Sequence, residues 1–154
     1  MEPDFLPPLI RALEAVPAAG IACPLVLGDG VDAVQSLGGV ASLWTGRCTR
    51  RFFGRPIEDL SKARWAEADF PIGACMLVKR ALLEEVGPLN EAYFLYYEDV
   101  ELGFRARHEA WLVLAIAQSR VRHRDTTNER CGDPLVSFYG TRNQAWVIAE
   151  YGRF

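Results

Sequence analysis

Four segments of the chain have apolar residues at the spacing of an α-helix. The first runs from Leu6 to Val16, with two prolines that fit a first helical turn and with Pro17 after its end. The others cover 81–86, the residues that follow Glu98–Asp99, and 135–151. In the last helix, Phe138, Trp146 and Ala149 lie on the predicted apolar side.

Three short apolar runs between these helices predict buried strands, over 21–27, 69–78 and 112–117. Pro24 lies inside the first run and predicts a sheet edge or an irregular strand, because proline donates no hydrogen bond. Residues 38–69 have no sustained period and predict a long loop. The alternation of helices and strands favours an α/β layer structure with a largely parallel sheet.

Length and composition narrow the class of protein. The 154 residues fit one domain over 1–154, and 50% hydrophobic content is typical of a packed globular chain. A net charge of -3 makes a nucleic-acid partner a poor hypothesis. No apolar run approaches the roughly 18 residues of a membrane span, and the start lacks signal-peptide features, which predicts a cytoplasmic location. Cys23, Cys48, Cys75 and Cys131 are widely spaced, which predicts free buried thiols.

The most informative stretch is an aromatic segment, 93–97, that leads into Glu98 and Asp99 at the start of a helix. Free backbone N–H groups and the helix dipole stabilise an anion at this position, so an ionised carboxylate there is able to accept a proton from a hydroxyl group. The alternative is that Asp99 is a helix cap and Glu101 a first-turn acid. Spacing alone favours that alternative.

A series of segments in a fixed order indicates a family. The segments are GACMLVKR at 73–80, VGPLNE at 86–91, FLYYEDVEL at 94–102, RAR at 105–107, then Trp111 and His123. Together they resemble the C-terminal half of family 2 glycosyltransferases, closest to the rhamnosyltransferase-like and galactofuranosyltransferase-like branch. Tyr139, Arg142 and Asn143 resemble a Y-x-x-R-N helix of the same family. The resemblance implies a partial GT-A fold, with a mixed, mostly parallel sheet and flanking helices.

The resemblance also implies a reaction and its groups. Asp99 matches the catalytic base that deprotonates an acceptor hydroxyl during inverting transfer from a nucleotide-diphosphate sugar, and Glu98 is its motif partner. His123 matches a ligand of the divalent metal, Mg or Mn, under the leaving diphosphate. The alternative for His123 is a strand-end histidine paired with Asp125.

Further residues have two interpretations each. Gly73 and Ala74 match a segment that lines the acceptor site, or they allow close packing of a buried strand. Arg142 and Asn143 contact a substrate phosphate or support the site, or they belong to a solvated helix face. The arginines between 47 and 55 meet an anionic donor or acceptor, or they lie in a solvated loop, which is the favoured reading.

One expected motif is missing from the sequence. The family has a metal-binding D-x-D before the region that this chain resembles, and the chain contains no D-x-D. We therefore expect an incomplete fragment that lacks the nucleotide-binding half and does not transfer sugar alone. Its expected partners are a nucleotide-sugar donor and a glycan or lipid-linked acceptor, with peripheral attachment to the inner face of a membrane left open. The alternative function is a non-catalytic assembly module that binds a second copy or the missing half through an exposed sheet edge.

Overall fold

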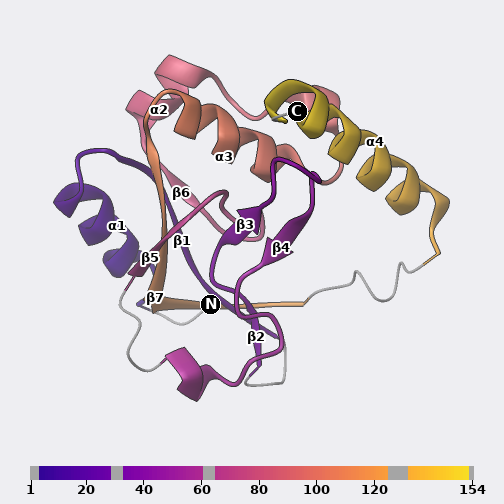
Figure 1. Ribbon diagram of the computed structural model, residues 1–154. Coiled ribbons are helices and arrows are strands. Elements are labelled where there is room, and N and C mark those ends of the chain that lie inside the picture. The colour runs from indigo at the N-terminus through magenta and orange to yellow at the C-terminus, as the bar shows by residue number, and fades with distance from the viewer. Residues whose placement is uncertain (1–3, 29–32, 61–64, 125–131, 153–154) are drawn as a thin grey trace.

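The computed structural model describes residues 4–28, 33–60, 65–124 and 132–152, and its centre is a mixed sheet (Figure 1). The strands of this sheet are ordered β2-β1-β7-β5, and β6 also pairs with β1. Their bounds are β1 Ala19–Gly28, β2 Val34–Ser36, β5 Trp65–Ala68, β6 Leu77–Val78 and β7 Leu112–His123. A separate hairpin joins β3, Gly39–Ala41, to β4, Cys48–Arg50.

The sheet combines one long parallel pairing with three shorter antiparallel ones. β1 and β7 run parallel from Ala19↔Leu112 to Gly28↔His123. β2, β6 and β5 each add an antiparallel pairing at the borders of this central pair. The predicted α/β class with a mixed sheet is confirmed. The parallel pairing of this sheet is that between its two long central strands, β1 and β7.

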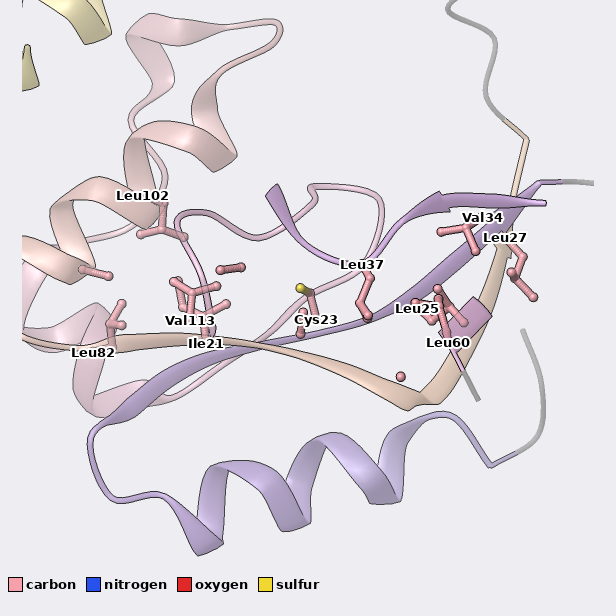
Figure 2. Close-up of a cluster of buried hydrophobic side chains, with 14 residues drawn as sticks. Ile21, Cys23, Leu25, Leu27, Val34, Leu37, Leu60, Leu82, Leu102 and Val113 are labelled. Carbon is pink, nitrogen blue, oxygen red and sulfur yellow. The ribbon is translucent and has the colours of Figure 1, made fainter. Parts of the chain in front are cut away.

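β1 is buried along its whole length because both of its faces are covered. On one face, the side chains of Ile21 and Cys23 pack with Leu82 and Leu102 from two helices, as Figure 2 shows. On the other face, Ala22 lies with Leu9 and Leu13 of the first helix. This two-sided burial explains the continuous apolar run in the sequence.

The described residues form four α-helices beside the sheet and the hairpin. They are α1 Leu6–Ala15, α2 Arg80–Val86, α3 Glu98–His108 and α4 Pro134–Tyr151, and 3₁₀ turns cover Ile57–Leu60 and Glu91–Tyr93. α1 lies on the side of β1 and β7 opposite the main core cluster (Figure 2). α4 packs near α3 and the hairpin through a third apolar cluster that includes Phe104 and Val147. No described helix is both long and apolar enough to span a lipid bilayer.

Ion pairs and hydrogen bonds join these layers. Glu101 is 2% exposed, pairs with Arg105 at 2.8 Å and accepts a hydrogen bond from the Tyr151 hydroxyl. Asp69 pairs with Arg107 at 2.5 Å and accepts from the backbone N–H of Ala41 at 2.8 Å. α3 is thereby tied to α4 on one side and to the hairpin on the other.

The structure corrects the sequence prediction, or decides between its alternatives as it does for Pro24, in four places. Pro24 is not at a sheet edge, because β1 is central, but the strand is irregular there: the partner in β7 shifts from Ile116 to Arg120 between Pro24 and Leu25. The predicted loop 38–69 contains the hairpin and β5. The predicted strand 69–78 is a strand only at Leu77–Val78, and most of the remainder is irregular.

The fourth correction concerns α4. Its predicted apolar side is largely turned to solvent, with Phe138 57% and Trp146 41% exposed. The buried residues of α4 are Asn143 and Val147. A polar residue is buried in place of the predicted apolar ones because backbone carbonyls of a neighbouring loop require a donor at that position.

The close contact between α3 and the segment after β5 gives a test of this packing. A Cβ atom added to Gly103 would lie 2.6 Å from Cα and 2.7 Å from Cβ of Phe70. We expect Gly103→Ala to lower the free energy of unfolding by about 1–3 kcal/mol, because backbone atoms must shift. Urea unfolding measures the change. Gly140→Ala is the matched control, since no atom lies within 4 Å of its added Cβ, and it should be neutral or stabilising by up to about 1 kcal/mol. Equal effects of the two substitutions would contradict this packing.

Candidate active site around Asp99

A cavity of about 720 Å³ opens where the carboxyl ends of β1 and β7 meet the hairpin, the start of α3 and α4. Ligands of open α/β sheets commonly bind at such strand ends. The lining residues come from β1, β2, β4, α3, β7, α4 and two loops: Val26, Gln35, Ser36, Cys48, Thr49, Arg50, Phe70, Ile72, Gly73, Ala74, Tyr96, Tyr97, Glu98, Asp99, Val100, His123, Val136 and Gly140. Five of the seven residues proposed from the sequence therefore line one cavity: Glu98, Asp99, Gly73, Ala74 and His123.

Asp99 is fixed by two backbone hydrogen bonds at the start of α3. Its Oδ2 accepts from the N–H of Gly73 at 2.8 Å, and its Oδ1 accepts from the N–H of Val100 at 2.8 Å. Both oxygens therefore have a defined orientation. This arrangement combines a helix-start acid with a long-range contact, which a capping role alone does not require.

Burial makes Asp99 a stronger base than an exposed carboxylate. Desolvation raises its pKa from 3.8 to about 6, the N–H of Gly73 opposes this shift, and the neighbouring charge of Glu98 adds to it. The sequence predicts that the helix start stabilises the Asp99 anion, but desolvation has the larger effect on the pKa of this carboxyl group. A carboxylate with a pKa of about 6 is still mostly ionised at pH 7 and is better matched to proton transfer.

Gly73 and Ala74 do not belong to a buried strand. They are exposed residues of a turn in which the N–H of Cys75 donates to the carbonyl of Ile72 at 3.1 Å. An added Cβ at Gly73 would lie 3.3 Å from Asp99 Oδ2 and 3.4 Å from Glu98 Oε1. The turn therefore brings a donor, without a side chain, close to both carboxylates. Strand packing, the alternative role, is excluded by the observed turn.

Glu98 faces the same turn. Its Oε2 is buried and has no hydrogen-bond partner among the described residues. The charge of Glu98 beside Asp99 is one of the causes that raise the pKa of Asp99.

The aromatic loop, residues 93–97, leads into these acids with an unusual backbone. Phe94, Tyr96 and Tyr97 have φ values of 56°, 64° and 69°. Such left-handed conformations are costly for residues other than glycine and cluster at functional sites. Tyr97 is also the N-cap residue of α3, so the loop sets the direction in which the helix begins.

Arg142 and Asn143 do not line the cavity and instead hold the aromatic loop. The Asn143 side chain donates to the carbonyls of Tyr93, Leu95 and Tyr96 at 2.7–2.8 Å. Arg142 donates to the carbonyl of Ala92 at 2.7 Å and to the side-chain oxygen of Asn143 at 2.8 Å. Arg142 and Asn143 therefore support the loop that leads into the site, and they do not belong to a solvated helix face.

His123 lies at the end of β7, exposed, on the cavity wall. Its Nδ1 is 3.3 Å from Oε1 of Gln35, and its backbone carbonyl accepts from Nε2 of Gln35 at 2.8 Å. Asp125, its alternative partner, lies outside the described residues. Among the described residues no group of three or more His, Cys, Asp or Glu side chains is placed to bind a metal ion. One imidazole is an incomplete ligand set for a hard divalent cation, so these residues alone do not form the predicted metal site.

The arginine cluster divides between the cavity and the hairpin surface. Arg50 lines the cavity, and its guanidinium lies 4.5 Å from the ring centre of Phe53. Arg51 donates to the carbonyl of Glu67 at 2.5 Å and so joins the hairpin to β5. Of the described arginines in this cluster, Arg50 is therefore the one that faces the cavity.

Sequence reasoning missed Gln35, Cys48 and Tyr97 as parts of the cavity wall. Burial raises the pKa of Tyr97 to about 12 and that of Cys48 to about 11, so both remain protonated near neutral pH. Their contact, with the thiol close to the phenol, joins the hairpin to the aromatic loop. No local pattern in the sequence indicates a contact between residues so far apart.

The fold and the cavity define an α/β domain with a partly buried carboxylate, Asp99, in a cavity at the ends of its parallel strands. Residues 5–149 match the family model described as glycosyltransferase like family 2. The chain belongs to this glycosyltransferase family. The predicted family is confirmed, and the observed mixed sheet with flanking helices is consistent with a GT-A-like domain.

Individual relatives support the same class over shorter stretches. The chain is 41% identical over 51 residues, 33% of its length, to an N-acetylglucosaminyl-diphospho-decaprenol L-rhamnosyltransferase of Mycobacterium tuberculosis. It is 44% identical over 41 residues, 27% of its length, to the low-salt glycan biosynthesis hexosyltransferase Agl10 of Haloferax volcanii. It is 25% identical over 135 residues, 84% of its length, to the O-antigen biosynthesis protein RfbC of Myxococcus xanthus. These alignments cover 17%, 13% and 10% of the relatives' own lengths.

The raised pKa of Asp99 predicts a pH dependence of stability. Between pH 3.8 and about 6 the folded state binds more protons than the unfolded state, so the free energy of unfolding falls as pH rises through this range. Asp99→Asn should remove this fall. Urea unfolding from pH 3.5 to 7.5 should show that the variant gains stability relative to the wild type as pH rises. Asp59→Asn, at an exposed position, is the control. A parallel pH dependence of wild type and Asp99→Asn would contradict the assignment.

Proposed function

We propose that this chain is the acceptor-side part of an inverting glycosyltransferase and that Asp99 is its general base. The observation that supports this most directly is the Asp99 carboxylate in the cavity wall, oriented by Gly73 and raised in pKa to about 6. Membership in glycosyltransferase family 2 supplies the reaction class.

The proposed step is a single displacement. Asp99 accepts the proton of an acceptor hydroxyl while the hydroxyl oxygen bonds to the anomeric carbon of the donor sugar. The bond from that carbon to the diphosphate oxygen breaks, and the electron pair leaves with the nucleoside diphosphate. The incoming oxygen attacks the face opposite the leaving group, so the anomeric configuration inverts. Glu98 keeps a second negative charge beside the base and so favours proton uptake by Asp99.

The acceptor in this proposal is a glycan or a lipid-linked glycan, and the donor is a nucleotide-diphosphate sugar. Tyr96 and Tyr97 supply aromatic rings to the cavity wall, and Gly73 and Ala74 leave room above the carboxylate. The relatives whose names mention a diphospho-decaprenol acceptor and O-antigen synthesis support this class of acceptor. A cytoplasmic location, with peripheral attachment at the inner face of the membrane, is part of the same proposal.

We also propose a divalent cation, Mg or Mn, with His123 as the described residue that would bind it. When bound, such an ion would neutralise charge on the leaving diphosphate. His123 is the described cavity residue that we propose as one ligand, with the remaining ligands outside the described residues. The proton transfer to Asp99 does not depend on this ion.

The alternative class is a non-catalytic assembly module. Trp65, which is 58% exposed on the border strand β5, is the observation that favours association with a second copy or with the nucleotide-binding half. Such association is compatible with catalysis, because the cavity lies at the strand ends and not at this border. We therefore propose the transferase first.

The general base is tested in the complete protein. Asp99→Asn should lower kcat by at least about 1,000-fold and leave donor binding within about twofold, because the amide accepts no proton. In the wild type, kcat/KM should rise about tenfold per pH unit up to about 6 and then level off, since the ionised carboxylate is the active form. Initial rates across pH and donor titrations measure both effects.

Asp59→Asn is the matched control, because this acid is exposed and lies outside the cavity wall. Turnover of Asp99→Asn at the control's rate would remove Asp99 from the mechanism.

The metal hypothesis has its own test. His123→Ala should raise the Mn²⁺ concentration needed for half-maximal activity by about tenfold or more, because one ligand is lost. His108→Ala, an exposed position at the end of α3, should leave the titration unchanged. Identical titrations of the two variants would assign His123 a structural role with Gln35.

A further inference from the structure

The YGTRN segment at 139–143 has a role that the cavity does not explain. Tyr139, Arg142 and Asn143 are spaced i, i+3 and i+4 on α4, so they share one face of the helix. None of the three lines the cavity. All three instead contact the aromatic loop or the residue before it.

Asn143 makes the most concentrated of these contacts. Its side chain is fully buried, and its one amide nitrogen lies within 2.8 Å of the carbonyl oxygens of Tyr93, Leu95 and Tyr96. Its oxygen accepts from Arg142, whose guanidinium reaches the carbonyls of Ala92 and Tyr93. We call Arg142 and Asn143 the amide clamp.

The amide clamp stabilises a backbone that the loop residues do not favour. Phe94, Tyr96 and Tyr97 are in the left-handed region, where side chains of this size are strained. Their backbone course brings several carbonyls to one point, and buried carbonyls without a donor are strongly unfavourable. The two N–H bonds of the Asn143 amide, together with the Arg142 guanidinium that also donates to Tyr93, supply donors to these carbonyls and so favour this conformation of the loop.

The aromatic loop ends at the start of α3, the helix turn that carries Asp99. Tyr97 is the N-cap of α3, and its carbonyl accepts from the N–H of Glu101 at 2.8 Å. Asp99 lies two residues beyond, with its carboxylate 2.8 Å from the N–H of Gly73. A change in the loop therefore changes the start of α3 and the Asp99–Gly73 hydrogen bond.

We infer that Asn143 is a positioning residue that acts on Asp99 through the aromatic loop, although it contacts neither substrate nor Asp99. The inference rests on the proposed function in that Asp99 is taken as the base. It replaces the hypothesis that Arg142 and Asn143 bind a substrate phosphate, because the Asn143 amide nitrogen and Nη2 of Arg142 donate to backbone carbonyls and Nε of Arg142 donates to Asn143.

The first test is kinetic and uses the complete protein. Asn143→Ala should lower kcat by about 100-fold, the typical effect of a misplacement of about 1 Å, and leave the KM for the donor within about twofold. Gln144→Ala is the matched control, because it removes an amide from the next position of α4 that donates to Gly46 and not to the loop. It should retain kcat within about threefold.

A double-mutant cycle separates positioning from general destabilisation. In an Asp99→Asn background, Asn143→Ala should lower the residual rate by less than about twofold, because its effect depends on the base. A further 100-fold loss in that background, or equal kcat for Asn143→Ala and Gln144→Ala, would overturn the inference.

A second measurement does not depend on activity. Hydrogen exchange at the Gly73 amide should be at least about tenfold faster in Asn143→Ala than in Gln144→Ala, although Gly73 touches neither residue. Unchanged exchange overturns the inference whatever the activity. Faster exchange in a protein that transfers no sugar would support the positioning contact and reject the proposed function. If Asn143→Ala does not fold, Arg142→Lys replaces it, because lysine keeps the charge but loses the planar fork. This variant should lower kcat by about tenfold and should also speed hydrogen exchange at the Gly73 amide.

Discussion

The site depends on the backbone of the aromatic loop. This loop turns sharply enough to bring three left-handed residues together and still delivers Glu98 and Asp99 to the first turn of α3. Its carbonyls converge on Asn143, whose side chain is completely buried. The hydrogen bonds within α3 do not fix this approach, because the loop precedes the helix. Helix α4 thus contributes to the candidate active site around Asp99, although its residues Arg142 and Asn143 lie outside the cavity wall.

The chemistry of the site follows from two opposing effects on one carboxylate. Burial raises the pKa of Asp99, and the N–H of Gly73 lowers it in part. Burial alone would move the group toward the neutral acid, and full exposure would make it a weak base. The turn at 72–75 supplies the balancing donor and places no side chain between that donor and the carboxylates. The helix start therefore contributes orientation more than charge stabilisation.

The sequence predicted the regular elements with strong local patterns. The periodicity of α1 and α2 and the apolar runs of β1 and β7 correspond to observed elements, because each has a face or a length determined by its own residues. The prediction of a strand over 69–78 was wrong because the apolar residues of this segment do not share one strand partner. Instead, Asp69 and Phe70 exchange backbone hydrogen bonds with Gly39, on the hairpin. The hairpin itself was missed because its strands are three residues long and stabilised by distant contacts.

The candidate site shows the same division. The resemblance to the family brought Asp99, Glu98, Gly73, Ala74 and His123 into one hypothesis, and the structure places all five on one cavity. The burial of Asn143 was not predictable from hydrophobicity, since it depends on carbonyls that are about 50 residues away in the sequence. The described cavity wall holds the Asp99 carboxylate, and Arg50 and His123 are its basic side chains. In the proposed reaction, acceptor deprotonation and compensation of the leaving diphosphate are therefore separate tasks, and we propose that the second uses groups beyond those described. This separation explains why a change at Asp99 is expected to alter turnover without altering donor binding.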